Sequence, residues 1–372
     1  MRALLIVMLT AGIASATPAE QVLARVNRYR AAAGLAAVRL DPKLSAGCME
    51  HAQYMLQNRG TDAMVGLNAH KQRANLPGAS AAGAACGKAA DLFPEVSDLD
   101  AAVDGWMASL YHRRPMLNPG LKTIGVGYAE LPEHTLMAAL MFADADDAKA
   151  AWPVRYPAGK QADVPLEFGN EVPNPIPGGG KAGYPITLQF PPFDAVTGVS
   201  ASLASGGKPV PFHLSDPEHP ATSFGQYGVI CVIPKQRLAA HTRYDVSITA
   251  TWHDQTTTAT WSFTTLDLRA VDAADEAAVV AAIGVASRVR GTVAYGGMMD
   301  TETAFLMIGP RDPKRYKMLS VLIPIAVWKQ LAGAAKPDAF TGKQLEVEAT
   351  PVFVQNKYLN LPVALATQVR VL

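Results

Sequence analysis

The chain has 372 residues, with 33 lysine or arginine residues against 32 aspartate or glutamate residues, and its formal net charge is +1. A charge this close to zero gives the whole chain no general attraction to nucleic acid or to an acidic membrane. Its three cysteines are too few for a disulfide-dense scaffold, so hydrophobic cores must carry the fold. A chain of this length predicts two or three domains.

The first residues have the composition of an export signal. Arg2 precedes an apolar run over residues 3–13, and Ala14-Ser15-Ala16 follows it. The run is shorter than the roughly 20 residues of a membrane span, and the small residues after it match a cleavage site. We therefore predict a signal peptide at residues 1–16 rather than a buried helix. Since no later run reaches membrane length, we expect a secreted or periplasmic protein without a transmembrane segment.

The region that follows shows helical periodicity. Val22, Val26 and Tyr29 share one face of a first predicted helix. Asp41 and Pro42 are typical of the N-cap and first position of a second helix.

Two separated motifs then suggest a family. The first is the pattern of the two helices just described. The second comprises Gly105-Trp106-Met107, Ser109, His112-Arg113, Leu117-Asn118-Pro119 and Ile124-Gly125-Val126-Gly127-Tyr128. In this order they resemble the bacterial branch of the CAP superfamily, which includes the cysteine-rich secretory and pathogenesis-related proteins. The resemblance covers residues 19–143 and implies an α/β/α sandwich with a cleft.

In many members of this family two histidines and two glutamates face the cleft and can hold a divalent metal such as zinc. Matched residue by residue, His112 and His70 take the histidine positions. Lys88 stands where one glutamate is expected, and the other is missing before His112. Two histidines beside an ammonium form a weak cation site. We therefore predict no cofactor, with His70 and His112 only weak metal candidates.

Two further features leave alternatives open. Ser109 lies one predicted helical turn from His112, so a nucleophile and base could meet there. The chain has no Gly-x-Ser-x-Gly motif and nothing that supplies an oxyanion hole, so Ser109 is more simply a packing or helix-surface residue. In an oxidising compartment Cys48 and Cys86 could form a disulfide, or they could remain reduced in the core.

The middle of the chain changes character twice. Residues 151–182 are rich in proline and glycine, a composition that predicts a linker without a core. Residues 183–266 alternate as strands and resemble a bacterial immunoglobulin-like sandwich. Tyr244, at the head of a strand, has the placement of a tyrosine corner, whose hydroxyl bonds upstream backbone.

The last part predicts three strands, a helix and two strands, an order that resembles an OB-fold barrel. From Ala286 onward there are eleven basic and six acidic residues, an excess of five. A polyanion or glycan face could use the aromatic and basic residues Phe305, Arg311, Lys314, Arg315, Tyr316, Lys317 and Tyr358. A solvated loop with core aromatics is the simpler interpretation, because an exported protein meets little nucleic acid.

We thus expect a multidomain chain: an α/β/α CAP-like sandwich, an immunoglobulin-like β-sandwich and an OB-like β-barrel. The expected boundaries are a signal peptide at 1–16, a CAP-like domain at 17–150, a linker at 151–182, a sandwich at 183–266, a helical connector at 267–286 and a barrel at 287–372. The favoured function is non-enzymatic binding of an envelope or extracellular ligand, which could be a glycan, a lipid or a protein. The alternatives are a hydrolase or protease acting through the cleft, and nucleic-acid binding by the barrel.

Overall fold

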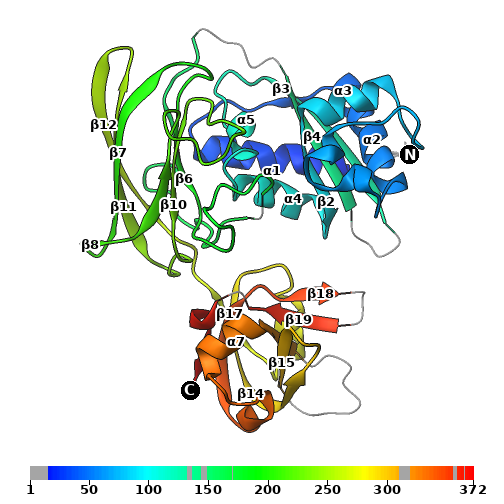
Figure 1. The fold of residues 1–372 in the computed structure, drawn as a ribbon, viewed down its shortest axis with the longest axis vertical. Coiled ribbons are helices and arrows are strands. Elements are labelled where there is room, and N and C mark those ends of the chain that lie inside the picture. The colour runs from blue at the N-terminus through cyan, green and yellow to red at the C-terminus, as the bar shows by residue number, and fades with distance from the viewer. Residues whose placement is uncertain are drawn as a thin grey trace, which may run out of the picture.

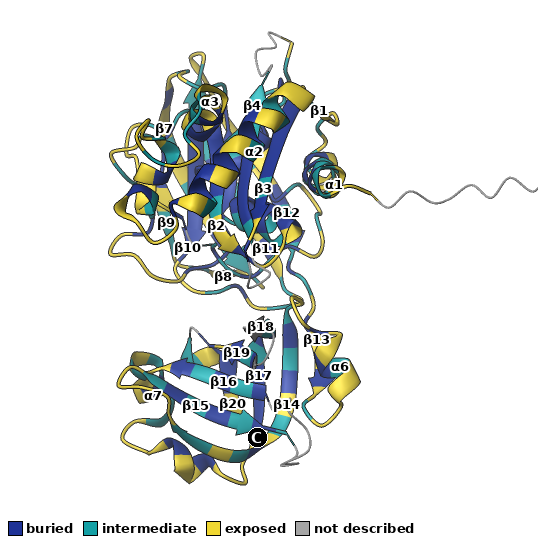
Figure 2. Ribbon diagram, turned by 90° about the vertical axis from the view of Figure 1, so that its right-hand side faces the viewer, coloured by how far each residue is buried: buried dark blue, intermediate teal, exposed yellow. Residues whose placement is uncertain are grey.

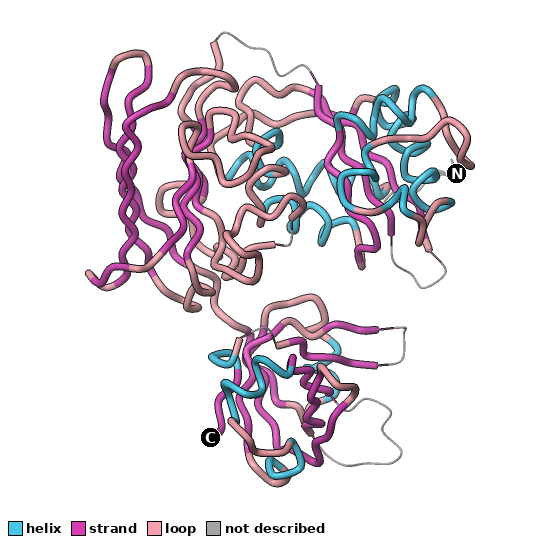
Figure 3. The backbone as a smooth tube through the Cα atoms, in the orientation of Figure 1, coloured by secondary structure: helices cyan, strands magenta, loops and turns pink. Residues whose placement is uncertain are grey.

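The computed structural model describes residues 16–131, 136–143, 149–169, 171–309, 319–354, 358–363 and 365–372. The predicted signal peptide lies outside this part except for its last residue. In Figure 1 the CAP-like region and a β-sandwich form one lobe, and the C-terminal unit lies below them. The helices gather at the N-terminal end of the upper lobe, as Figure 3 shows. Within the described residues no helix is long and apolar enough to cross a membrane.

Both predicted helices are present, and the second begins at the expected residue. The first, α1, spans Pro18–Ala32 and is capped by Thr17, which exchanges bonds with Glu20 in a capping box. The second, α2, spans Pro42–Gln57, and the carboxylate of Asp41 accepts the backbone N–H groups of its first turn. The remaining helices of this region are η1 (Asp62–Met64), η2 (Gly66–His70), α3 (Ala81–Ala89), α4 (Leu99–Met107) and α5 (Arg113–Met116).

These helices cover a four-stranded sheet on both faces. Its order is β1-β3-β4-β2, with β1 at Arg39–Leu40, β2 at Ala90–Val96, β3 at Thr123–Glu130 and β4 at Leu136–Ala143. Ile124 and Val126 share a core with residues of α1 and α4. On the opposite face a Cβ on Gly127 would lie 2.0 Å from the backbone of Cys48 in α2. The glycines of this strand therefore let α2 lie directly on the sheet, and Figure 2 shows the buried strand beneath it.

The β-sandwich consists of two four-stranded sheets, ordered β5-β6-β10-β9 and β12-β11-β7-β8. Their bounds are β5 (Val154–Tyr156), β6 (Ile186–Gln189), β7 (Val196–Ser205), β8 (Lys208–Pro209), β9 (Phe212–Ser215), β10 (Val229–Pro234), β11 (Arg243–Trp252) and β12 (Gln255–Thr264). The tyrosine corner is present, since the backbone N–H of Ala239 donates to the Tyr244 hydroxyl at 2.8 Å. The immunoglobulin-like assignment remains a prediction.

The prediction of a coreless linker at residues 151–182 is wrong. Its first part supplies β5, and Tyr156, Val164, Leu166 and Phe168 are all buried. The prolines and glycines here separate single apolar side chains that each reach a core. The average composition of residues 151–182 is rich in proline and glycine, so it does not reveal these buried apolar residues.

The CAP-like region and the sandwich share a core, because one cluster of buried apolar residues has members in both, from Val22 to Leu268. Arg113 is buried at their junction. Its Nη1 donates to the carbonyl of Pro185 at 2.6 Å, and its guanidinium lies over the rings of Tyr156 and Tyr184. The two units therefore pack as one body.

The C-terminal unit has its own core and an eight-stranded sheet, ordered β18-β19-β16-β15-β14-β17-β20 with β13 paired to β14. The strands are β13 (Arg269–Asp272), β14 (Ser287–Met298), β15 (Thr303–Ile308), β16 (Leu319–Pro324), β17 (Gln344–Ala349), β18 (Val352–Val354), β19 (Tyr358–Pro362) and β20 (Val369–Val371). The expected helix, α7 (Ile325–Ala332), lies between β16 and β17; η3 (Pro337–Phe340) and η4 (Ala366–Gln368) are short.

Two expectations for this unit need correction. The sheet has eight strands rather than five, because the chain adds a parallel strand before the unit and further strands near its end. The predicted helical connector at 267–286 contains β13 and only a short helix, α6 (Glu276–Val280). The alanine-rich composition of residues 267–286 predicts a helix. The first part of this segment is extended instead, because β13 pairs with β14. The OB-like assignment remains a prediction.

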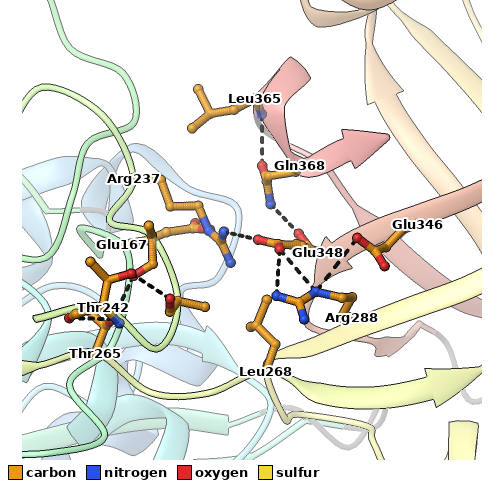
Figure 4. Close-up of polar contacts among 12 residues, drawn as sticks. Glu167, Arg237, Thr242, Thr265, Leu268, Arg288, Glu346, Glu348, Leu365 and Gln368 are labelled. Carbon is orange, nitrogen blue, oxygen red and sulfur yellow. Dashed lines mark hydrogen bonds and ion pairs between the residues drawn. The ribbon is translucent and has the colours of Figure 1, made fainter. Parts of the chain in front are cut away.

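An ion-pair network joins the C-terminal unit to the sandwich, as Figure 4 shows. Arg237 has a side chain only 9% exposed and contacts Glu167 at 2.6 Å and Glu348 at 2.7 Å. Glu348 also pairs with Arg288. A single arginine thus links carboxylates from both sides of the junction.

Candidate binding cleft

His70 and His112 line the same pocket, as the sequence predicted for a cleft. The pocket has a volume of about 250 Å³. Its wall is largely apolar and is formed by Met64, Gly66, Leu67, Ala69, Leu92, Phe93, Pro94, Trp106 and Val172, and Glu171 lines it beside His112. Exposed apolar side chains surround it: Val65 is 67% exposed and Val172 is 53% exposed.

His112 lies in a turn, and not in one helix with Ser109 as the sequence predicted. The helix α4 ends at Met107, and the backbone N–H groups of Ala108 and Ser109 still donate to helix carbonyls, at Asp104 and Trp106. Those of Leu110, Tyr111 and His112 donate instead to the carboxylate of Glu171, at 2.9, 2.6 and 3.1 Å. A carboxylate that satisfies three backbone donors replaces the helical carbonyls, so the chain turns here.

The same carboxylate fixes the imidazole. Nδ1 of His112 lies 2.9 Å from Glu171 Oε1, whose side chain has no exposed surface. The ring therefore donates from Nδ1 and leaves Nε2 outside this contact. His70 is held similarly, because its Nδ1 donates to the carbonyl of Gly87 at 2.8 Å.

The two imidazoles have opposite pKa shifts. Burial by itself would lower the pKa of His112, but the hydrogen bond to Glu171 and the charges of Asp91 and Glu171 outweigh it and raise that pKa. For His70 burial dominates and lowers the pKa, with the nearby charge of His112 acting in the same direction. The pKa of His112 therefore lies above the ordinary value of a histidine and that of His70 lies below it, although both rings line one pocket.

Asp91 is a buried acid next to this site. It lies in β2, and its Oδ2 has no hydrogen-bond partner among the described residues. Burial raises the pKa of Asp91 to about 8, although the charges of His112 and Arg114 pull it down. The carboxyl is thus protonated at neutral pH.

Ser109 and Lys88 do not line the pocket. Ser109 is fully buried, and its hydroxyl donates to the carbonyl of Trp106 at 2.7 Å, with His112 Nδ1 at 3.3 Å. That nitrogen is already directed at Glu171, so it cannot serve as a base for Ser109. Lys88 is exposed in the last turn of α3, so the expected ammonium beside the histidines is absent from the pocket wall.

His51 lies outside the cleft and packs in the interior of the protein. His51 in α2 is fully buried, and its Nδ1 lies 3.1 Å from the amide of Gln72. Burial lowers its pKa to about 4. A Cβ on Gly87 would lie 2.3 Å from the His51 ring, so this glycine makes room for the imidazole.

Cys48 and Cys86 are joined in a disulfide, which is the first of the two alternatives that the sequence left open.

The cleft does not fit the metal that the family resemblance implies. Among the described residues no three histidine, cysteine or acidic side chains are grouped so as to hold a metal ion. The carboxylate of Glu171 is fully engaged by three backbone donors and an imidazole. Among the described residues that line the pocket, this leaves the Nε2 atoms of the two imidazoles as ligand atoms, too few for a zinc site.

The predicted polyanion face falls partly beyond the described residues. Arg311, Lys314, Arg315, Tyr316 and Lys317 lie outside them, and so does the side chain of Tyr358. Phe305 is described: it is half-buried in β15, and its ring packs edge-on against Tyr295 at 6.0 Å between centroids. It lies on the opposite face of the strand from buried Ala304 and Leu306, so the expectation that it belongs to the core is wrong.

Sequence reasoning missed Glu171 and Asp91. Asp91 could have been noticed as a lone acid in the apolar run Ala90 to Phe93. The sequence around Glu171 gives no signal of this kind, because Glu171 lies in the proline-rich segment whose composition predicts a linker. It is also 59 residues from His112.

The family model of CAP, the cysteine-rich secretory protein family, matches residues 23–142. Among solved structures the chain is similar to an extracellular protein containing a SCP domain from Bacillus anthracis str. Ames. The two are 21% identical with a TM-score of 0.26, and the similarity covers 33% of this chain and 39% of that one. The chain thus spans well under half of that protein. No curated protein matches.

Proposed function

From the CAP domain at residues 23–142, we propose that this chain is an exported binding protein that holds a small amphipathic molecule in the cleft without turning it over. One observation carries the proposal: a largely apolar pocket of about 250 Å³ lined by two imidazoles, one of which contacts Glu171. Such a pocket accepts an apolar body and a single hydrogen-bonding head. Of the ligand classes considered, a lipid-like molecule fits this wall better than a glycan.

The absence of a nucleophile in the wall argues for binding rather than turnover. None of the described residues that line the pocket carries a hydroxyl or a thiol. The nearest serine, Ser109, is buried and donates to a backbone carbonyl. Covalent catalysis needs a nucleophile in contact with a base and with the substrate, and the cleft offers none.

The exposed apolar side chains beside the cleft support the same ligand class. Val65, Leu67 and Val172 are 67%, 43% and 53% exposed. A soluble surface rarely groups such residues without a use. They would contact the part of an acyl chain that extends beyond the small pocket.

Calorimetric titration of the mature chain, residues 17–372, with octanoate and with 1-octanol tests this proposal. We expect saturable binding of at least one, weakened about fivefold by Leu67→Ala, since roughly 1 kcal/mol of apolar contact is lost. Leu214→Ala is the matched control, because Leu214 is 38% exposed on β9, away from the cleft. Binding of a chitin trimer with no heat from either amphiphile would refute the proposal.

The hydrolase alternative keeps one supporting observation, the carboxylate–imidazole pair of Glu171 and His112. Such a pair orients a general base that activates water. Hydrolysis of p-nitrophenyl butyrate that disappears in His112→Gln and persists in Leu214→Ala would favour this alternative over simple binding.

A further inference from the structure

A second concave site lies at the junction of the CAP domain and the β-sandwich. It is a groove of about 820 Å³ that shares no lining residue with the cleft. Three parts of the chain form it: the C-terminal end of α1 at Ala32–Gly34, the segment 155–160, and the strands β7, β11 and β12. The two units share one core, so the groove belongs to a fixed junction.

The strands present small polar side chains to this groove. Ser247 on β11 pairs in register with Ser202 on β7 and with Thr260 on β12, so the three form one row across the sheet. The adjacent row has Ala204, Asp245 and Ser262. Side chains alternate between the two faces of a strand, and therefore both rows lie on the same face. Their short side chains leave room above the sheet.

The hydroxyls of the two rows at the groove differ from those elsewhere on this face. Further along the same hairpin, the hydroxyls of Thr249 and Thr258 bond each other at 2.8 Å, and those of Thr251 and Thr256 at 2.7 Å. In the part of the chain that the structure describes, the hydroxyls of Ser202, Ser247, Thr260 and Ser262 make no such bond. Each can donate one hydrogen bond and accept two.

The groove also carries an excess of positive charge. Arg155, Lys160 and Arg243 line it together with one acid, Asp245. Asp245 pairs with Arg243 at 2.8 Å. Arg155 and Lys160 are exposed and have no carboxylate partner among the described residues.

Acceptors are present as well. The C-terminal end of α1 lies at the groove and carries a partial negative charge of about half a unit, and Asp245 adds carboxylate oxygens. These groups oppose a bare anion, yet they suit a ligand that brings its own hydroxyl donors.

We propose that this groove binds a short acidic oligosaccharide, a chain of sugars that carry carboxylates. The sugar hydroxyls exchange hydrogen bonds with the two serine and threonine rows, with Asp245 and with the C-terminal end of α1. The fork of Arg155 takes a carboxylate through two parallel bonds, and Lys160 neutralises a second charge. The site is independent of the cleft and of its ligand.

Calorimetry of the mature chain with trigalacturonate, maltotriose and inorganic phosphate separates the ligand types. We expect trigalacturonate to bind about tenfold more tightly than maltotriose, because only the acidic sugar brings carboxylates that pair with Arg155 and Lys160. Inorganic phosphate should show no saturable binding. Equal affinity for the acidic and neutral sugars, tighter binding of phosphate, or no binding of trigalacturonate would each overturn the proposal.

Variants locate the site. Arg155→Gln with Lys160→Gln should weaken trigalacturonate about tenfold or more, and Ser247→Phe should block the groove. Lys208→Gln with Lys235→Gln removes the same two charges from exposed positions of the same sandwich outside the groove. The inference fails if this control pair weakens binding as much as the groove pair does. Thermal melting of each variant confirms that it is folded.

Discussion

Replacing Glu171 with glutamine should destabilise the protein and change how its stability responds to pH. The carboxylate accepts the backbone N–H groups of Leu110, Tyr111 and His112 and lies 2.9 Å from the imidazole. Glutamine has nearly the same shape, so the substitution leaves no cavity. It removes the charge and places an amide N–H₂ against groups that are themselves donors.

The size of the effect follows from those contacts. Hydrogen bonds to a charged group contribute about 1.5–3 kcal/mol each, and a buried donor left without a partner costs about 1–3 kcal/mol. Glutamine keeps one carbonyl oxygen, so only part of the set is lost, and we expect a loss of about 3 kcal/mol. At about 2–4 °C per kcal/mol for a unit of this size, Tm should fall by roughly 6–12 °C.

The pH dependence has a definite sign. In the native protein the pKa of His112 is raised. The stability that this histidine contributes is present below its unfolded pKa of about 6.5 and is lost as pH rises through the folded-state value. In Glu171→Gln the imidazole of His112 loses the charge and the charged hydrogen-bond partner at residue 171 that raise its pKa. Burial then dominates, and the pKa of His112 falls below its ordinary value. Asp91, whose pKa is about 8, is protonated at pH 5.5 and cannot compensate.

Thermal melts followed by circular dichroism at pH 5.5 and pH 8 measure both effects. The difference in Tm between the native protein and Glu171→Gln should be larger at pH 5.5. Glu218→Gln is the control, since Glu218 is an exposed glutamate that accepts one backbone N–H, from Gly198. Equal losses in the two variants, or a difference in Tm that does not grow as pH falls, would contradict this account of Glu171.

Four other outcomes follow from the same contacts. Because the pKa of Asp91 is raised from 3.8 to about 8, its carboxyl makes the free energy of unfolding fall by ~1.4 kcal/mol for each pH unit between these values. In Asp91→Asn the free energy of unfolding, measured with urea from pH 5 to 7, should therefore depend less on pH. Removing the disulfide by Cys48→Ala with Cys86→Ala should cost about 4 kcal/mol in the loop-entropy model for a separation of 38 residues, and melts with and without reductant would coincide only in the variant. Arg237→Ala should cost about 2 kcal/mol and speed proteolysis at the C-terminal junction, because two carboxylates lose a nearly buried partner. Calorimetric titration with zinc should give no dissociation constant tighter than about 1 μM, and tighter binding would mean that the cleft has ligands not identified above.

Local signals in the sequence predicted the elements of the CAP domain well. The cap residue Asp41 with Pro42 located the start of α2, and the motif from Ile124 to Tyr128 that carries the family resemblance lies in β3. The family match at residues 23–142 agrees with the motifs that suggested it. These features depend on neighbours a few residues apart, through capping, periodicity and close glycine contacts, so they can be derived from the chain itself.

The tertiary structure decided what completes the cleft. A family pattern pointed to His70 and His112, whereas the acid that holds His112 comes from the segment taken for a linker. Glu171 has no local requirement to be an acid. It is charged, buried and stable only because folding brings three backbone N–H groups and an imidazole around it. The shared core of the CAP domain and the sandwich has the same origin, since apolar side chains in a proline-rich segment show no periodicity until another unit covers them.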